Sequence, residues 1–88
     1  MVLSKAEKVL REIEDVARRR RFLPIIGPSR GQILVKVARE IKPKRVLEIG
    51  TLVGYSAILI GKELSGDAHL ITLEIEANAA RMAEENIR

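Results

Sequence analysis

The sequence has 88 residues, 16 basic against 12 acidic side chains, and no cysteine. A chain of this length buries only about two-thirds of the surface that its unfolded form exposes, which is enough for one small domain. The lack of cysteine excludes disulfides and cysteine-ligated metal sites, and no run of about eighteen apolar residues is present to span a membrane. The amino terminus does not resemble a secretory signal, so we expect a cytoplasmic protein.

The first helix is expected from about residue 4 to residue 20. Ser4 and Glu7 have the spacing of a capping box. Apolar residues then recur on one helical face, at Ala6, Val9, Leu10, Ile13, Val16 and Ala17. The run from Arg18 to Arg21 suits the carboxyl-terminal end of a helix dipole, and we interpret it as a solvated helix end. A patch for RNA or another acidic partner is the alternative.

Residues 22–28 form an apolar loop, and a second helix is expected from about Ser29 to Ile41, ending before Pro43. Its inner face is predicted to carry Ile33, Leu34, Val37, Ala38 and Ile41. A strand over 45–49, a helix over 55–64, a strand over 68–73 and a helix over 77–87 follow. Strands joined in this way pair in parallel. The sequence therefore predicts an α/β fold whose two-stranded sheet leaves one apolar face uncovered.

The two predicted strands each end in an acid, and a glycine turn follows the first strand. Glu74 lies twenty residues after Gly54, where an acid can accept hydrogen bonds from ribose hydroxyls. Leu52 replaces the middle glycine of a phosphate-binding turn, so its side chain sits where a diphosphate needs bare backbone. The turn therefore suits a nucleoside without a phosphate chain, such as S-adenosylmethionine, and disfavours a dinucleotide.

Three segments in chain order resemble the class I S-adenosylmethionine-dependent O-methyltransferases, in the catechol and caffeoyl-CoA branch. They read GPSRGQIL over 27–34, LEIGTLVGYS over 47–56 and ITLE over 71–74. The resemblance covers residues 24–87. It implies the amino-terminal part of a Rossmann-like α/β fold: two helices, then β-α-β-α with a parallel strand pair and an incomplete sheet. The implied organisation is a helical segment over 1–42 and the first βαβα half of the S-adenosylmethionine-binding domain over 43–88.

The resemblance implies that two acids and two glycines contact or shape the cofactor site. Glu74 would bind the ribose hydroxyls, with capping of the next helix as the structural alternative. Glu48 would lie beside the methionine end of the cofactor, and its alternative is a buried acid satisfied by backbone N–H groups. Gly50 would allow close approach of the ligand, and Gly54 would allow the turn into the next helix.

Three further positions are implied as cofactor contacts. Ser56, in the first turn of a helix, would meet the ligand carboxylate, or is a plain helix-terminal residue. Ile26 would contact the methionine end through its backbone, or fills the core. Tyr55 is either a ring packed against the sheet or a wall of the ligand pocket, and the sequence does not decide between them.

The implied activity is methyl transfer from S-adenosylmethionine to a hydroxyl oxygen of a small-molecule acceptor, with this chain supplying the cofactor-binding half. No catalytic residue and no metal ligand is assigned; a divalent metal (Mg²⁺) assists catechol-type relatives, and its ligands are expected outside this chain. The chain is interpreted first as a fragment, with a homodimer that completes the sheet or a split enzyme as alternatives. A non-catalytic cofactor- or partner-binding module and an RNA-directed methyltransferase using Arg18 to Arg21 also remain open.

Overall fold

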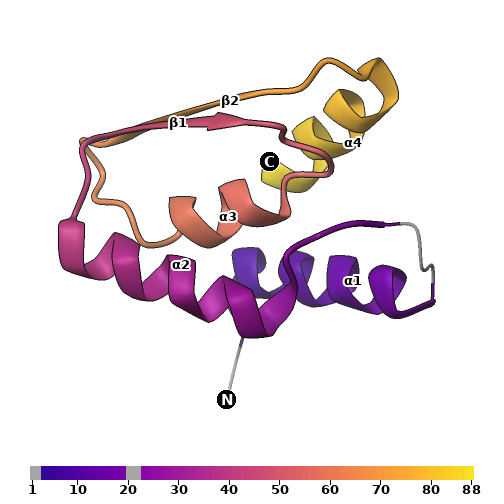
Figure 1. The fold of residues 1–88 in the computed structure, drawn as a ribbon, viewed down its shortest axis with the longest axis horizontal. Helices are drawn as coiled ribbons and strands as arrows, with labels where there is room; N and C mark the ends of the chain where they lie inside the picture. The colour runs from indigo at the N-terminus through magenta and orange to yellow at the C-terminus, as the bar shows by residue number, and fades with distance from the viewer. Residues whose placement is uncertain (1–2, 20–22) are drawn as a thin grey trace.

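The computed structural model describes residues 3–19 and 23–88 (Figure 1). Its elements are α1 (Lys5–Arg19), α2 (Gly27–Ile41), β1 (Arg45–Ile49), α3 (Tyr55–Gly61), β2 (His69–Leu73) and α4 (Ala77–Ile87). The two strands form one layer, α3 lies beneath them, and α1 and α2 lie on the other side of α3. Two helices followed by β-α-β-α with a parallel strand pair is the predicted order, which is therefore confirmed.

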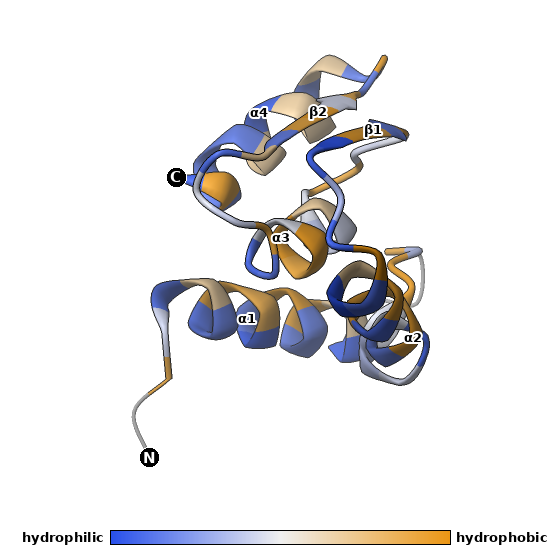
Figure 2. Cartoon of the chain, turned by 90° about the vertical axis from the view of Figure 1, so that its left-hand side faces the viewer, coloured by the Kyte–Doolittle hydropathy of each residue, from blue (hydrophilic) through white to orange (hydrophobic). Residues whose placement is uncertain are grey.

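The predicted capping box starts α1. The N–H of Ser4 donates to the Glu7 carboxylate at 3.1 Å, and the N–H of Glu7 donates to the Ser4 hydroxyl at 3.2 Å. This reciprocal pair satisfies two backbone donors that the first helical turn leaves free. Leu10 and Ile13 are buried against α3, and Figure 2 shows the apolar side of α1 turned toward α3. The predicted helical face is thus the packed face.

The packed face of α2 matches the predicted one only in part, at Leu34 and Ala38. Gly31, Leu34, Val35 and Ala38 are buried or half-buried, whereas Ile33, Val37 and Ile41 are exposed. A Cβ atom at Gly31 would lie 2.7 Å from Leu59 Cδ1, so the missing side chain lets Leu59 of α3 approach the backbone of α2. With α2 packed on this side, Ile33 and Ile41 face outward.

Helix α3 forms the centre of the core. Tyr55, Ile58 and Leu59 cluster with Leu10 and Ile13 of α1, so the predicted segments 1–42 and 43–88 contribute to one shared core. The helix ends at Gly61, earlier than predicted. The chain continues in tighter turns, with the N–H groups of residues 63 and 64 donating to the carbonyls three residues before them.

The two faces of the sheet differ in their surroundings. Val46, Glu48, Leu70 and Thr72 are half-buried on the inner face, which α3 covers, and Glu48 lies opposite Thr72 in the parallel register. Leu47, Ile49, Ile71 and Leu73 are exposed on the outer face. The sheet thus has the uncovered apolar face that the sequence predicts for two strands.

Candidate functional site

The loop over residues 50–54 is held against β2 by backbone hydrogen bonds. The N–H groups of Gly50 and Thr51 donate to the Leu73 carbonyl at 2.8 and 3.2 Å. Gly50, Leu52 and Gly54 all have left-handed backbone, with φ of 94°, 52° and 92°. Glycine adopts this conformation readily, but it costs a residue with a Cβ atom roughly 1–2 kcal/mol. The surrounding contacts must therefore hold Leu52 in place.

Glu74 supplies one of these contacts. Its Oε1 accepts the Leu52 N–H at 2.7 Å, and its Oε2 accepts the Glu76 N–H at 3.0 Å. The backbone donors of Glu76 and then Leu52 hold the pKa of Glu74 below its ordinary value, so this carboxyl is ionised at neutral pH. Glu76, not Glu74, caps α4, by accepting the Ala79 N–H at 2.7 Å.

Glu48 is the centre of a hydroxyl network on the inner face of the sheet. The Ser56 hydroxyl donates to Glu48 Oε2, and the Thr72 hydroxyl donates to Glu48 Oε1 at 2.7 Å. The hydroxyl oxygens of Thr72 and Thr51 are 2.5 Å apart. Within the described residues, no ion pair includes Glu48. Glu48 therefore accepts hydrogen bonds from side-chain hydroxyls. The alternative drawn from the sequence is a buried acid that accepts from backbone N–H groups.

The two predicted glycines have different surroundings. A Cβ atom at Gly50 would meet no atom within 4 Å, whereas one at Gly54 would lie 3.3 Å from Ile87 Cγ1 of α4. The side-chain amide of Asn86, also on α4, donates to the Val53 carbonyl at 2.8 Å. Gly50 thus borders open space, and Gly54 lies where the loop packs on α4.

Tyr55 and Ile26 are not among the hydrogen-bond partners of Glu48 and Glu74 in the described part of the chain. The Tyr55 side chain is 2% exposed, and its hydroxyl donates to Glu14 of α1, on the side of α3 away from the sheet. Burial, and then Glu14, raise the pKa of this hydroxyl. The ring packs in the core cluster among the helices rather than against the sheet, and Tyr55 as a wall of the ligand pocket stays a prediction. Ile26 is the N-cap residue of α2, is 37% exposed, and has no recorded hydrogen bond to the other predicted residues in the described chain.

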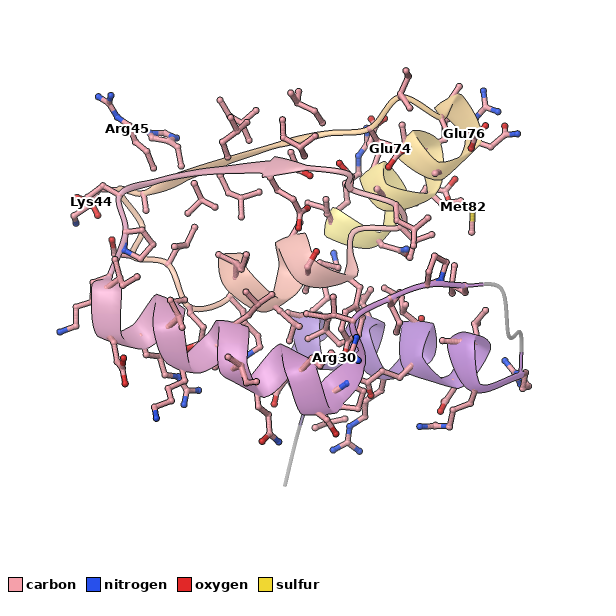
Figure 3. All side chains as sticks on the ribbon, viewed as in Figure 1. Arg30, Lys44, Arg45, Glu74, Glu76 and Met82 are labelled. Carbon is pink, nitrogen blue, oxygen red and sulfur yellow. The ribbon has the colours of Figure 1, made fainter. Side chains whose placement is uncertain are left out.

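Charge is divided along the strands (Figure 3). Glu74 and Glu76 lie at their carboxyl ends, whereas Lys44 and Arg45 lie at their amino ends. The Lys44 ammonium pairs with Asp67 at 2.9 Å, at the same amino end. The candidate site at the carboxyl ends is therefore acidic.

Two clefts can be compared with the positions of Glu48 and Glu74, and neither acid lines the larger one. A cleft of about 560 Å³ lies between the helices and is lined by Glu14, Tyr55 and residues of α2. A cleft of about 360 Å³ at the strand ends is lined by Thr51, Thr72, Glu74 and α4. We place the candidate site at the strand ends because the ionised carboxylate and the left-handed loop lie there. No cluster of three or more metal-ligating side chains occurs among the described residues.

The arginine run is described only in part. Arg18 pairs with Asp15 one turn earlier on α1, and Arg19 is exposed. Arg20 and Arg21 lie outside the described residues. The alternative of a nucleic-acid patch over Arg18 to Arg21 therefore stays a prediction.

Thr72 and Thr51 belong to the hydroxyl network although the sequence patterns predict no role for either of them. A signal for Thr72 exists: pairing the two predicted strands in parallel places this polar residue beside Glu48 on the same face. No comparable signal exists for Thr51 or Asn86, because their contacts depend on the path of the loop and the position of α4.

Comparison with known proteins decides the family. The family model described as O-methyltransferase matches residues 2–88. The chain belongs to this family. The human protein named transmembrane O-methyltransferase is 38% identical over 80 residues, which are 91% of this chain and 28% of that protein. Zebrafish (Danio rerio) catechol O-methyltransferase B is 37% identical over 81 residues, which are 92% of this chain and 31% of that protein.

The solved structures agree with this assignment. The O-methyltransferase TomG from Streptomyces achromogenes, involved in tomaymycin synthesis and solved in complex with SAM, superposes with a TM-score of 0.78. Its sequence identity is 30%, over 91% of this chain and 36% of TomG. The predicted fold, the amino-terminal part of a Rossmann-like class I O-methyltransferase, is therefore confirmed. The chain spans less than a third of the two curated relatives, and no described helix has the length and apolar character to cross a bilayer.

Proposed function

We propose that residues 43–88 bind S-adenosylmethionine at the carboxyl ends of β1 and β2, as the cofactor-binding half of an enzyme that methylates a hydroxyl oxygen of a small molecule. The helical segment 1–42 completes the core beneath this half. The observation that carries the proposal is the pair of carboxylates, Glu48 and Glu74, held on either side of a left-handed loop that borders open space.

The surroundings of Glu48 fit the cationic amino-acid end of the cofactor. Each carboxylate oxygen has about two acceptor positions, and Ser56 and Thr72 use one on each oxygen. Glu48 has no cationic partner in the described part of the chain. An ammonium group donating to the remaining positions would form the charge-assisted hydrogen bond that Glu48 lacks. The backbone of Ile26 is proposed to contact the same end.

Glu74 fits the ribose. Its two oxygens accept the Leu52 and Glu76 N–H groups, and each keeps an acceptor position for a hydroxyl donor. The lowered pKa keeps the group ionised, so it accepts from both ribose hydroxyls. Ser56 as a contact for the ligand carboxylate stays a prediction, since its proton is directed at Glu48 in this structure.

Leu52 restricts the class of ligand. Its backbone is left-handed at φ 52°, and its side chain, half-buried against the core, adds a Cβ atom at the position that is glycine in a pyrophosphate-binding turn. A nucleoside joined to an amino acid needs no such approach. We therefore favour S-adenosylmethionine over a dinucleotide.

The residues of this chain bind and orient, and the bound cofactor supplies an electrophilic methyl group. Alignment of the acceptor oxygen with that methyl group is the main requirement for transfer. We assign no catalytic base and no ligand for a divalent metal within the described residues. Both remain expectations from the family resemblance.

Calorimetric titration with S-adenosylhomocysteine tests the proposal. Glu74→Ala removes the ribose acceptor and is expected to weaken binding at least about tenfold, since hydrogen bonds to charged groups contribute about 1.5–3 kcal/mol. Glu85→Ala, an exposed acid on α4, is the matched control and should bind like the unchanged protein. Unchanged affinity in Glu74→Ala would sink the ribose assignment.

A second measurement separates an enzyme from a binding module. Transfer of labelled methyl groups from S-adenosylmethionine is followed with a catechol, a phenolic thioester and an RNA as acceptors. Transfer to the first or second acceptor supports the proposal. Cofactor binding without transfer to any acceptor would favour a non-catalytic module, and transfer to RNA alone would favour the RNA-directed alternative.

A further inference from the structure

A second hydroxyl lies behind the direct neighbours of Glu48. Thr72 contacts Glu48, and Thr51 contacts Thr72 but not the carboxylate. We propose that Thr51 and Thr72 form a relay that positions the Glu48 carboxylate for the amino-acid end of S-adenosylmethionine, so that both threonines determine affinity for that end of the cofactor. This inference rests on the proposed function.

The direction of the relay follows from counting protons. A threonine hydroxyl has one proton to donate and can accept from other donors. As a carboxylate, Glu48 can only accept, so the Thr72 proton is directed at Glu48. Thr51 must then donate its proton to the Thr72 oxygen. The order is Thr51 to Thr72 to Glu48, with Ser56 donating to the second carboxylate oxygen.

The relay joins three separate segments of the chain. Thr72 lies on β2 opposite Glu48 on β1, and Thr51 lies in the loop that follows β1. Thr51 is the one buried polar residue in the described part of the chain, at 5% exposure. Its N–H donates to Leu73, and its carbonyl accepts from Gly54 at 2.9 Å, so its backbone is fixed on both sides. Thr51 is therefore a rigid anchor for the hydroxyl that contacts the carboxylate.

A carboxylate held in this way loses little freedom when a ligand binds. Ordering a flexible side chain at a binding site costs free energy, and pre-organisation removes this cost. Without Thr72, Glu48 keeps only the Ser56 contact and can rotate away from the ligand. The loss should affect ligands that have the amino-acid end and should spare ligands that lack it.

The test compares two ligands and two substitutions. S-adenosylhomocysteine contains the amino-acid end, whereas 5′-methylthioadenosine has the same nucleoside without it. Thr72→Val removes the hydroxyl at nearly constant shape and should weaken S-adenosylhomocysteine about tenfold, or about 1.4 kcal/mol. Binding of 5′-methylthioadenosine should stay within about twofold of its original value. Thr72→Ser, which restores the hydroxyl, should recover the affinity.

A matched control lies on the same strand. Ile71→Val removes one methyl group from the outer face of β2 and should change neither affinity. If Thr72→Val does not fold, Thr51→Val replaces it, with the same selectivity between ligands but a smaller loss, because Glu48 keeps its Thr72 contact. Calorimetry on the folded variants measures all of these constants.

Each outcome bears on a different claim. Selective loss for S-adenosylhomocysteine with recovery in Thr72→Ser supports the relay. Equal loss for both ligands, or no loss for either, overturns it and leaves Thr72 as a purely structural residue. Failure of the unchanged protein to bind S-adenosylhomocysteine overturns the proposed function itself, and the relay falls with it.

Discussion

The inner face of the two-stranded sheet combines apolar side chains with paired polar groups, whereas the outer face exposes apolar side chains. On the inner face, Glu48 and Thr72 are half-buried beneath α3 and are hydrogen-bonded to each other. On the outer face, Ile49 and Ile71 are 77% and 61% exposed. Polar groups are tolerated in a covered position when they are paired. Here that pairing occurs where the candidate ligand binds.

The two faces of the sheet have different roles. The inner face combines support for α3 with a polar network that leads to the strand ends. The outer face carries a contiguous set of apolar side chains, a feature that usually marks a surface for further contacts. If matched substitutions on the two faces had equal effects on stability, the proposed difference between the faces would be contradicted.

The largest expected effect separates two isoleucines. Ile58 of α3 is 8% exposed, and Ile58→Ala should lower the free energy of unfolding by about 2–5 kcal/mol through loss of buried surface and a cavity. Ile71→Ala, the matched change on the outer face, should cost less than about 0.5 kcal/mol. Urea denaturation measures both. Equal losses would mean that the outer face is covered in the folded protein.

Glu48→Ala should have the next largest effect. The change leaves the Ser56 and Thr72 hydroxyls without their acceptor, and we expect a loss of about 1–2 kcal/mol in the free energy of unfolding without ligand. Glu85→Ala provides the exposed control. A more stable Glu48→Ala protein would instead show that the inner acid is kept for binding at the expense of folding.

A smaller effect is expected from adding charge to the outer face. The double substitution of Ile49→Lys with Ile71→Lys should reduce the fluorescence of a bound hydrophobic dye, because it interrupts the exposed apolar patch. Stability should change by less than about 0.5 kcal/mol per site. Glu85→Lys controls for charge alone. Loss of the folded state would argue that these side chains are packed.

The smallest effect concerns acid pH at the strand ends. The pKa of Glu74 is lowered from 4.5 in the folded protein, so the stabilisation from its hydrogen bonds is complete above about pH 4.5 and is lost as the pH falls through the lower folded value. NMR titration should show the Leu52 amide shifting with the Glu74 carboxyl. In Glu74→Gln this titration should disappear. A Leu52 amide that still titrates would assign its shift to another group.

Sequence patterns were most informative within single elements and short motifs. The capping box of Ser4 and Glu7, the buried face of α1 and the parallel strand order are all local or follow from strand and helix spacing, and the structure contains each of them. The inner face of α2 was predicted less well. Its isoleucines, Ile33 and Ile41, are as apolar as core residues, and periodicity alone does not distinguish them from the residues that face α3.

The order of elements, the family motifs and the acids at the two strand ends can be predicted from the sequence, because they depend on residue type and spacing along the chain. Which side chains meet depends on the folded chain: Gly31 contacts Leu59, Glu48 bonds Thr72, and the Leu52 N–H bonds Glu74. Each pair joins residues more than twenty positions apart. Such contacts depend on helix rotation, strand register and loop path, which only the packed chain defines.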